Sequence, residues 1–250
     1  MTVPRFGAGV YRAYRPSYPE ALFQRIVDEL PPPHRRALDL GAGTGLSTAP
    51  LCTWFDEVIA VEPDEAMAAS LASLSPRVRV RSVSAEECDE PADSVDLVTS
   101  GNAFYWMDGP EIVAKVARWL RPGGLLVVYR YGFPQAPREV QSLLAEELFQ
   151  RWGAYVHTRL SDSDYSQRVI ESSNVFADVR KQLAPNDVYL DAHQLVGFFR
   201  STSFGSAYLE TLPDGAEYLA GLERRIVAAV GPDPFPVDFG LEVIAARKAA

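Results

Sequence analysis

The 250-residue chain has the composition of a globular protein, with 47% hydrophobic and 23% charged residues. Its formal net charge of −9 makes nucleic acid an unfavourable partner, because an acidic surface repels phosphate backbones. No stretch reaches the roughly 20 apolar residues of a membrane span, and the first residues lack the apolar core of a signal peptide. We therefore expect a cytoplasmic protein with no membrane partner, and the two cysteines and three histidines favour no metal site.

Strand-like and helix-like segments alternate along the first 131 residues. After an amphipathic helix at 20–30, strands are predicted at 36–40, 56–63, 78–83, 94–100 and 125–131. Helical patterns separate several of them, at 45–55, 64–74 and 109–124. This alternation is typical of a parallel sheet with helices on both faces, whose ligands bind beyond the carboxyl ends of the strands.

The pattern changes near residue 132, where prolines precede a long amphipathic helix at 138–152 and a polar stretch. We predict one domain in three parts: an N-terminal lid and core (1–131), an inserted cap or substrate region (132–175), and a C-terminal completion of the α/β domain (176–250). The last part reads as a strand-like segment at 177–191, helices at 192–203 and 213–230, and a final strand at 236–248.

A glycine-rich turn, Gly-Ala-Gly-Thr-Gly at 41–45, separates the first predicted strand from its helix. It is neither GxGxxG nor a P-loop, because no Lys-Ser/Thr follows. Glu62 ends the second strand about twenty residues later, where a carboxylate can accept both hydroxyl protons of an adenosine ribose. Asp39 places another carboxylate beside the turn, which suits a cationic group more than a diphosphate. S-adenosylmethionine (SAM), with its ammonium, its sulfonium and no phosphate, is therefore favoured over NAD.

The motifs around this turn resemble those of the class I SAM-dependent methyltransferases. They read RALDLGAGTG, VEPDEAM, SAEE, SVDLVTSGNAFYWMD and LRPGGLLVV. YRAYRPSYP near the start and the closing EVIAARK are similar to a small-molecule branch, the methyltransferase type 11 and trans-aconitate-methyltransferase-like enzymes. The resemblance implies a Rossmann-like seven-stranded sheet of order 3-2-1-4-5-7-6, with the last strand antiparallel, helices on both faces and a helical cap. It also implies SAM as cofactor and S-adenosylhomocysteine (SAH) as product.

The resemblance assigns cofactor contacts to matching positions. Asp39 and the turn residues 41–43 would hold the methionine part of SAM, and Glu62 would hold the ribose. Arg15, in an N-terminal lid with Tyr14, would pair with the SAM carboxylate. The full set of predicted cofactor-binding residues is Arg15, Asp39, Gly41, Ala42, Gly43, Glu62, Pro63, Met67, Ala85, Glu86 and Asn102.

The acceptor side is predicted from the chemistry of methyl transfer, an in-line displacement that needs alignment and exclusion of water. A base is needed only for an acceptor of high pKa. The family often has His-Trp where this chain has Tyr105-Trp106, so one candidate base is missing. The candidate catalytic residues are His157, Tyr105 and Tyr14. The candidate acceptor-binding residues are Tyr105, Trp106, Arg159 and Arg200.

Several alternatives stay open beside a methyltransferase of a small-molecule acceptor. One is a SAM- or SAH-binding protein of this fold with other chemistry, such as a cyclase. A second is a protein or nucleic-acid N-methyltransferase, because Asn102-x-x-Tyr105 is similar to an NPPY motif, although both prolines are missing. A third is an NAD-type dehydrogenase. The sequence leaves open the acceptor, the methylated atom and the choice between a monomer and a homodimer.

Overall fold

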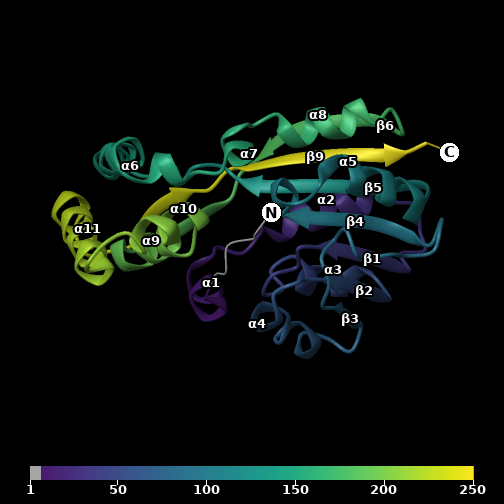
Figure 1. Cartoon of the computed structure of the whole chain (residues 1–250), viewed down its shortest axis with the longest axis horizontal. Helices are drawn as coiled ribbons and strands as arrows, with labels where there is room; N and C mark the ends of the chain where they lie inside the picture. The colour runs from purple at the N-terminus through teal and green to yellow at the C-terminus, as the bar shows by residue number, and fades with distance from the viewer. Residues whose placement is uncertain (1–6, 250) are drawn as a thin grey trace.

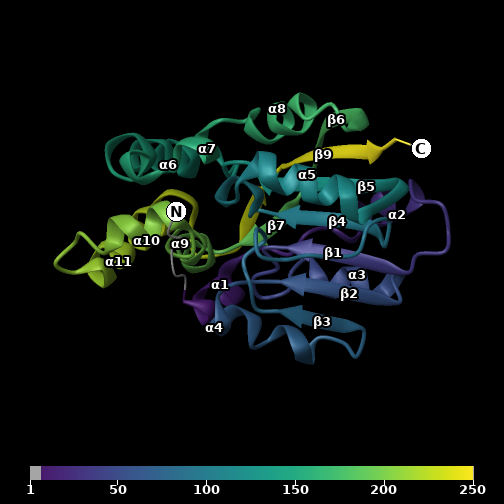
Figure 2. The ribbon, with the colours of Figure 1, turned by 45° about the vertical axis from the view of Figure 1, so that its right-hand side comes forward.

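Two parts make up the structure, an α/β sheet domain and a helical lobe beside it (Figures 1 and 2). The computed structural model describes residues 7–249. Seven strands form the central sheet in the order β3-β2-β1-β4-β5-β9-β6. They are β1 (Arg36–Leu40), β2 (Glu57–Val61), β3 (Val78–Arg81), β4 (Val95–Gly101), β5 (Leu120–Tyr131), β6 (Phe176–Ala184) and β9 (Leu241–Lys248).

The strand order and directions match those predicted. β9 runs antiparallel to β5 and β6, whereas β1 to β5 pair in parallel. β7 (Asp187–Leu190) and β8 (Phe235–Asp238) form a separate two-stranded sheet, so β6 and β9 are the sixth and seventh strands of the large one. The predicted order 3-2-1-4-5-7-6 is therefore confirmed. The predicted final strand is divided into β8 and β9, because Gly240 adopts a positive φ of 24° between them.

Helices cover both faces of the sheet, α2 (Glu20–Asp28) and α3 (Thr48–Trp54) on one and α5 (Gly109–Trp119) and α8 (Tyr165–Ser172) on the other. On β1, Ala37 packs in the core beneath α2 and α3, and its neighbour Leu38 packs in the core beneath α5 and α8. This alternation follows from the two-residue period of a strand. Both faces are thus apolar, as expected for a parallel sheet buried on two sides.

The predicted helix at 64–74 is interrupted in the structure. Only α4 (Glu65–Ala68) and a short 3-10 turn, η1 (Leu71–Ser73), form there. Between them the hydroxyl of Ser70 donates to the carbonyl of Met67 at 3.1 Å. Such local hydrogen bonds compete with a regular helix, which explains the break.

The helical lobe lies at one end of the sheet domain, on the left in Figure 1. It contains α6 (Arg138–Gln150), the 3-10 turn η3 (Trp152–Tyr155), α9 (Ala192–Arg200), α10 (Ser203–Leu209) and α11 (Gly215–Val230). Trp152 stacks on Phe199 with ring centroids 4.4 Å apart, and both are almost fully buried. The apolar core of the lobe is continuous with the core beneath α2 and α3.

The lobe draws on two distant stretches of the chain. The predicted cap, residues 132–175, contributes α6 and η3, whereas α8 of the same range lies on the sheet and contacts α5 and β6. Helices α9 to α11, which we expected to complete the sheet domain, instead pack with α6 and η3. The contact between Trp152 and Phe199 joins residues far apart in sequence, so no local pattern reveals it.

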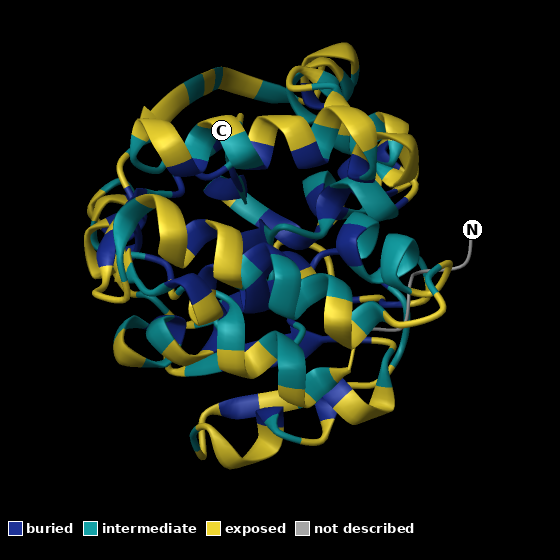
Figure 3. Ribbon diagram, turned by 90° about the vertical axis from the view of Figure 1, so that its left-hand side faces the viewer, coloured by how far each residue is buried: buried dark blue, intermediate teal, exposed yellow. Residues whose placement is uncertain are grey.

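The lid helix α1 (Ala8–Tyr14) packs against α9 of the lobe. Its Tyr14 ring fills the space beside Gly197 of α9, where an added Cβ would lie 2.1 Å from the ring. Glycine at this position therefore allows the two helices to approach closely. Figure 3 views the molecule from the side of the lobe, where exposed residues follow the outer helix faces and buried residues turn inward.

Candidate active site

A cavity of about 580 Å³ lies beyond the carboxyl ends of β1, β2, β4 and β5. Residues from the sheet domain line one half of it, and residues from α1, α6, α9, α10 and the loops of the lobe line the other. Its volume is within the usual range for small-molecule sites, about 300–1,000 Å³. This is the edge of a parallel sheet where ligands bind.

The glycine turn after β1 brings main chain to the wall of the cavity. Gly41 and Gly43 line it, with φ angles of +69° and +56° that favour glycine. A Cβ on Gly41 would lie 2.4 Å from the Cβ of Ala103. The turn is held to β2 because the backbone N–H groups of Gly41 and Ala42 both donate to the carbonyl of Val61, at 2.9 and 3.0 Å.

Glu62 projects into the cavity from the end of β2. Its two carboxylate oxygens accept one backbone N–H each, from Gly43 at 2.8 Å and from Asp64 at 2.9 Å. Each oxygen keeps a free lone pair, so the group can accept two further hydroxyl protons. Burial raises the pKa of Glu62, since only 7% of the residue is exposed. The geometry fits a ribose diol.

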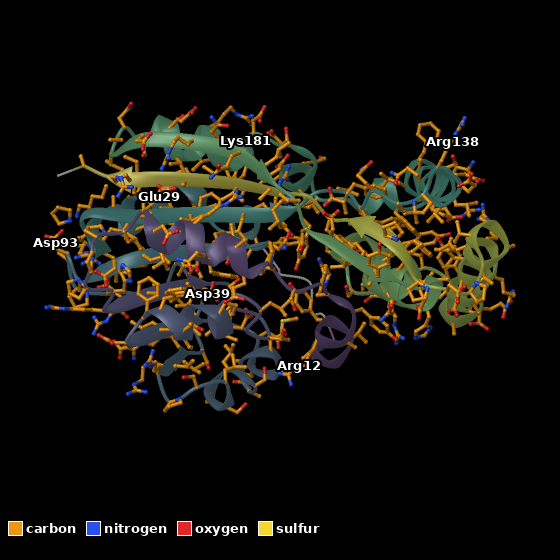
Figure 4. All side chains as sticks on the ribbon, turned by 180° about the vertical axis from the view of Figure 1, so that it is seen from behind. Arg12, Glu29, Asp39, Asp93, Arg138 and Lys181 are labelled. Atoms are coloured by element: carbon orange, nitrogen blue, oxygen red, sulfur yellow. The ribbon has the colours of Figure 1, made fainter. Side chains whose placement is uncertain are left out.

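Asp39 lies behind the turn, inside the sheet domain, and does not line the cavity (Figure 4). Its carboxylate accepts hydrogen bonds from the hydroxyls of Thr48 at 2.7 Å and Thr99 at 3.0 Å. Burial raises the pKa of Asp39 to about 6. Both oxygens thereby hold α3 and β4 against β1, and the contact of Asp39 with the cofactor stays a prediction. Ala42 is also turned into the core.

The next wall comes from the segments after β2 and β3. Glu86 is fixed here, because its Oε1 accepts the backbone N–H of Asp108 at 2.8 Å. Met67 is 95% buried, and an added Cβ on Gly43 would lie 3.8 Å from its sulfur. The lining residues of this part include Pro63, Asp64, Met67, Ser84, Ala85 and Glu86. The predicted cofactor-binding residues Pro63, Met67, Ala85 and Glu86 thus lie on one wall of the cavity, and their roles stay predictions.

Asn102 shapes the junction between β4 and β5. It adopts a left-handed φ of +54°, which Asn tolerates better than most residues. Its amide nitrogen donates to the hydroxyl of Tyr18 at 2.7 Å, and its amide oxygen accepts the backbone N–H of Tyr131 at 3.1 Å. Asn102 lines the cavity, but its side chain is already occupied by these two partners, which sequence reasoning missed.

Arg15 brings a positive charge to the cavity from the C-terminal end of the lid. Its guanidinium lies between the rings of Tyr11 and Phe198, at 4.8 and 5.1 Å, and donates to the carbonyl of Ser201 at 3.0 Å. Its Nε is buried without a hydrogen-bond partner. No carboxylate within residues 7–249 forms an ion pair with it. Tyr14, by contrast, hydrogen-bonds His193 at 2.9 Å and does not line the cavity, and its catalytic role stays a prediction.

The acceptor half of the cavity is aromatic and aliphatic. Tyr105 and Trp106, the predicted walls, both line it. Burial raises the pKa of Tyr105 to about 12, so its hydroxyl stays protonated at neutral pH and can donate a hydrogen bond. Its catalytic role stays a prediction. Sequence reasoning missed the side chains opposite these two residues. They include Phe133, Pro134, Leu148, Leu160, Phe198 and Phe204.

His157 lies behind Trp106 and does not line the cavity. Its ring centroid is 4.9 Å from that of Trp106, and its Nδ1 accepts the backbone N–H of Arg159 at 3.2 Å. It thereby caps α7 (Thr158–Ser161). The structure thus places His157 beside the cavity wall rather than in the cavity, and its role as an acid or base stays a prediction.

The two arginines predicted to bind an acceptor anion also lie elsewhere. Arg159 donates to the carbonyl of Met107 at 2.8 Å and lies over the ring of Tyr165 at 5.0 Å, so it ties α7 to the sheet domain. Arg200 lines a separate hollow between α1, α10 and α11. Neither side chain lines the cavity, and their contacts with an acceptor stay predictions.

An ion pair that the sequence did not reveal lies at the border of the cavity. Arg130 and Glu242 face each other on the antiparallel strands β5 and β9, with Nε and Oε2 2.6 Å apart. Arg130 also donates to the carbonyl of Leu160 at 2.7 Å, which holds α7 over the site. Only the register of β5 with β9 brings the two charges together, so no local motif could have found them.

Among residues 7–249, no group of His, Cys, Asp and Glu is arranged to hold a metal ion. None of the helices described is both long and apolar enough to cross a membrane.

Comparison with known proteins agrees with this geometry. Residues 38–128 match the model of a family described as a methyltransferase domain. An uncharacterized methyltransferase of Mycobacterium tuberculosis is 40% identical over 118 residues, which cover 47% of this chain and 47% of that protein. A protein named as a methyltransferase in Dictyostelium discoideum is 25% identical over 207 residues, covering 80% of this chain and 76% of its own.

A solved structure is similar over nearly the whole chain. It is described as a type II methyltransferase from Anaeromyxobacter dehalogenans, is 25% identical, and superposes with a TM-score of 0.78 over 94% of this chain and 98% of that one. The sheet order, the glycine turn with Glu62, and these matches lead to one conclusion. Residues 38–128 are similar to a methyltransferase domain, and the chain has the fold of the class I SAM-dependent methyltransferases.

Proposed function

We propose that this protein transfers a methyl group from SAM to a small-molecule acceptor (EC 2.1.1.-). The proposal rests on one observation, that a single continuous cavity reaches both groups of residues. It joins the glycine turn and Glu62 at one end to the aromatic walls Tyr105 and Trp106 at the other. A cofactor and an acceptor can therefore meet inside one cavity.

The residues present fit SAM. Glu62 would accept the two ribose hydroxyls, and the positive-φ turn at Gly41 and Gly43 leaves room for the aminocarboxypropyl chain. Arg15, whose buried Nε lacks a partner, would pair with the cofactor carboxylate. Pro63, Met67, Ala85 and Glu86 would contact the adenine. The bound cofactor supplies an activated methyl group, so the chain's own task is to align the acceptor and exclude water.

Two features support a small acceptor rather than a macromolecule. The acceptor half of the cavity is lined by the lobe and the lid, and the volume of the whole cavity suits small molecules. The formal charge of −9 opposes binding to nucleic acid. A SAM-binding protein of this fold with other chemistry, such as a cyclase, is the alternative that a transfer assay separates.

Calorimetric titration with SAM, SAH and NAD tests the cofactor directly. We expect SAM and SAH to bind, and Glu62→Ala to weaken binding by about 1–3 kcal/mol, the cost of losing a charged hydrogen-bonding group. Glu65→Ala is the matched control, because Glu65 is exposed on the adjacent helix α4. Binding of NAD instead of SAM, or unchanged affinity in Glu62→Ala, would contradict the proposal.

A further inference from the structure

Among the described residues that line the acceptor half of the cavity, no carboxylate is free of an ion pair. Three of the lining carboxylates, Glu62, Asp64 and Glu86, come from the segments after β2 and β3, which the proposed function assigns to the adenosine part of SAM. The fourth, Glu242, is 2.6 Å from the guanidinium of Arg130. To take a proton, the Glu242 carboxylate would have to give up this ion pair.

The hydroxyls and the imidazole near the site are also unsuited to take a proton. Tyr131 donates its hydroxyl to the carbonyl of Pro16. Tyr105 keeps its proton, because burial raises its pKa to about 12. His157 uses its Nδ1 to cap α7 and does not line the cavity. None of these three described side chains is therefore placed to receive a proton from a neutral alcohol bound in the acceptor half.

The charged and titratable groups around Tyr105 are Arg15 and Tyr11 on the lid α1 and Arg130 on β5. Arg130 is paired with Glu242, and the proposed function pairs Arg15 with the cofactor carboxylate. The positive charge left beside the Tyr105 hydroxyl in the loaded site is therefore the cofactor sulfonium, which favours a negative acceptor.

We infer that the acceptor is an apolar molecule that binds as an oxyanion, such as an acidic phenol, an enol or a carboxylic acid already ionised at neutral pH. This inference rests on the proposed methyltransferase function. The apolar body would lie against Leu148, Leu160, Phe198 and Phe204. The oxyanion would accept a hydrogen bond from the Tyr105 hydroxyl, near the cofactor sulfonium, where low dielectric strengthens the attraction.

The reaction balances without a base in the protein. A lone pair of the acceptor oxyanion forms the new O–C bond to the methyl carbon. The C–S bond breaks, and its electron pair stays on the sulfur. The products are a neutral methyl ether or ester and the thioether SAH. The acceptor's proton has already passed to solvent before binding.

The test uses four probes that share one naphthalene ring. At neutral pH 1-naphthoate and 2,4-dinitro-1-naphthol are anions, 1-naphthol is neutral, and 1-naphthylmethylamine is a cation. Each is titrated into protein saturated with sinefungin, a SAM analogue that carries an ammonium and transfers no methyl group. We expect the anions to bind at least about tenfold more tightly than the neutral and cationic probes, since hydrogen bonds to charged groups are the stronger ones.

Each binding result either supports or overturns the inference that the acceptor is an anion. Preference for naphthoate alone or for dinitronaphthol alone supports it and tells a carboxylate acceptor from a phenolate. Equal or tighter binding of 1-naphthol or the amine overturns it, and so does absence of binding by all four probes. If sinefungin and SAH themselves fail to bind, the proposed function fails. If they bind without a preference for anions, only this inference fails.

Two variants sharpen the result. Tyr105→Phe should reduce the preference for anions about tenfold, with SAH affinity unchanged, because the ring stays and only the donor is lost. His157→Asn is the matched control, because Asn can still cap α7 but does not titrate. It should leave the preference within about twofold of the wild-type value. A fall in the His157→Asn variant as large as that in Tyr105→Phe would contradict the assignment of the donor.

Discussion

The two halves of the cavity are built in different ways. The sheet-domain half consists of main chain and carboxylates at successive strand ends, with Gly43 and Glu62 hydrogen-bonded to each other. The lobe half consists of apolar side chains such as Leu148 and Phe204, from helices distant in sequence. Strand ends of a parallel sheet meet at one edge whatever the acceptor. The first half can therefore stay constant among relatives while the second changes with the acceptor.

The largest effect is expected in the glycine turn of the sheet-domain half. Gly41→Ala should lower the free energy of unfolding by about 3–4 kcal/mol, because it adds a left-handed alanine and a clash with Ala103. Gly123→Ala is the control, since Gly123 has a similar φ of +79° and open space around it. Urea unfolding of both variants measures the difference. Equal losses would show that the turn is not tightly packed.

The buried Asp39 gives the sheet domain a pH dependence. Its pKa is raised from 3.8 to about 6 in the folded state, so the folded protein binds more protons than the unfolded chain between these values. Its contribution to stability is therefore fully present below pH about 4 and falls as pH rises to about 6, by up to about 3 kcal/mol. Asp39→Asn should lose this slope. Unfolding curves of both proteins across that range test it, and parallel curves would contradict the assignment.

Arg15 links the two halves, because it reaches the cofactor end from a lid mounted on the lobe. Arg15→Met should weaken SAH binding about tenfold or more, since a charged hydrogen bond is lost while packing between Tyr11 and Phe198 is kept. Binding of 5′-methylthioadenosine, which lacks the carboxylate, should not change. Arg12→Met on the exposed side of α1 serves as control (Figure 4). Equal losses for both ligands would place Arg15 away from the carboxylate.

The smallest effect is expected at the outer contact of the lid. Tyr14→Phe removes an exposed hydrogen bond to His193 and should change stability and turnover by no more than about 0.5 kcal/mol. Turnover with any accepted substrate, or probe binding, measures it. A hundredfold or larger loss of turnover would instead support a catalytic role for Tyr14.

The sequence predicted the parts of the site that depend on local order. The turn at Gly41 and Gly43, Glu62 at the next strand end and the sheet order follow from segments of a few residues each, and the structure brings these two turn glycines and Glu62 to one cavity. Asp39 lies next to the turn in sequence, yet its partners Thr48 and Thr99 turn it away from the cavity. The position of Asp39 in the sequence predicted that it lies near the turn, but not which way its side chain points.

The acceptor side resisted prediction for a physical reason. Whether His157, Arg159 or Arg200 faces the cavity depends on how the lobe packs on the sheet, which no local period encodes. Arg130 and Glu242 become partners only through the antiparallel register of β5 and β9. Phe198 and Phe204 cannot be told from other apolar helix residues in the sequence, because they reach the cavity only through the placement of α9 and α10.

One titration series tests the division of the cavity most directly. SAH is titrated into wild type, Glu62→Ala and Phe204→Ala, and 1-naphthoate is then titrated into each protein saturated with sinefungin. We predict that Glu62→Ala loses about 1–3 kcal/mol of SAH affinity. Phe204→Ala should keep SAH affinity but lose naphthoate affinity. Loss of SAH affinity in Phe204→Ala with retention in Glu62→Ala would contradict it.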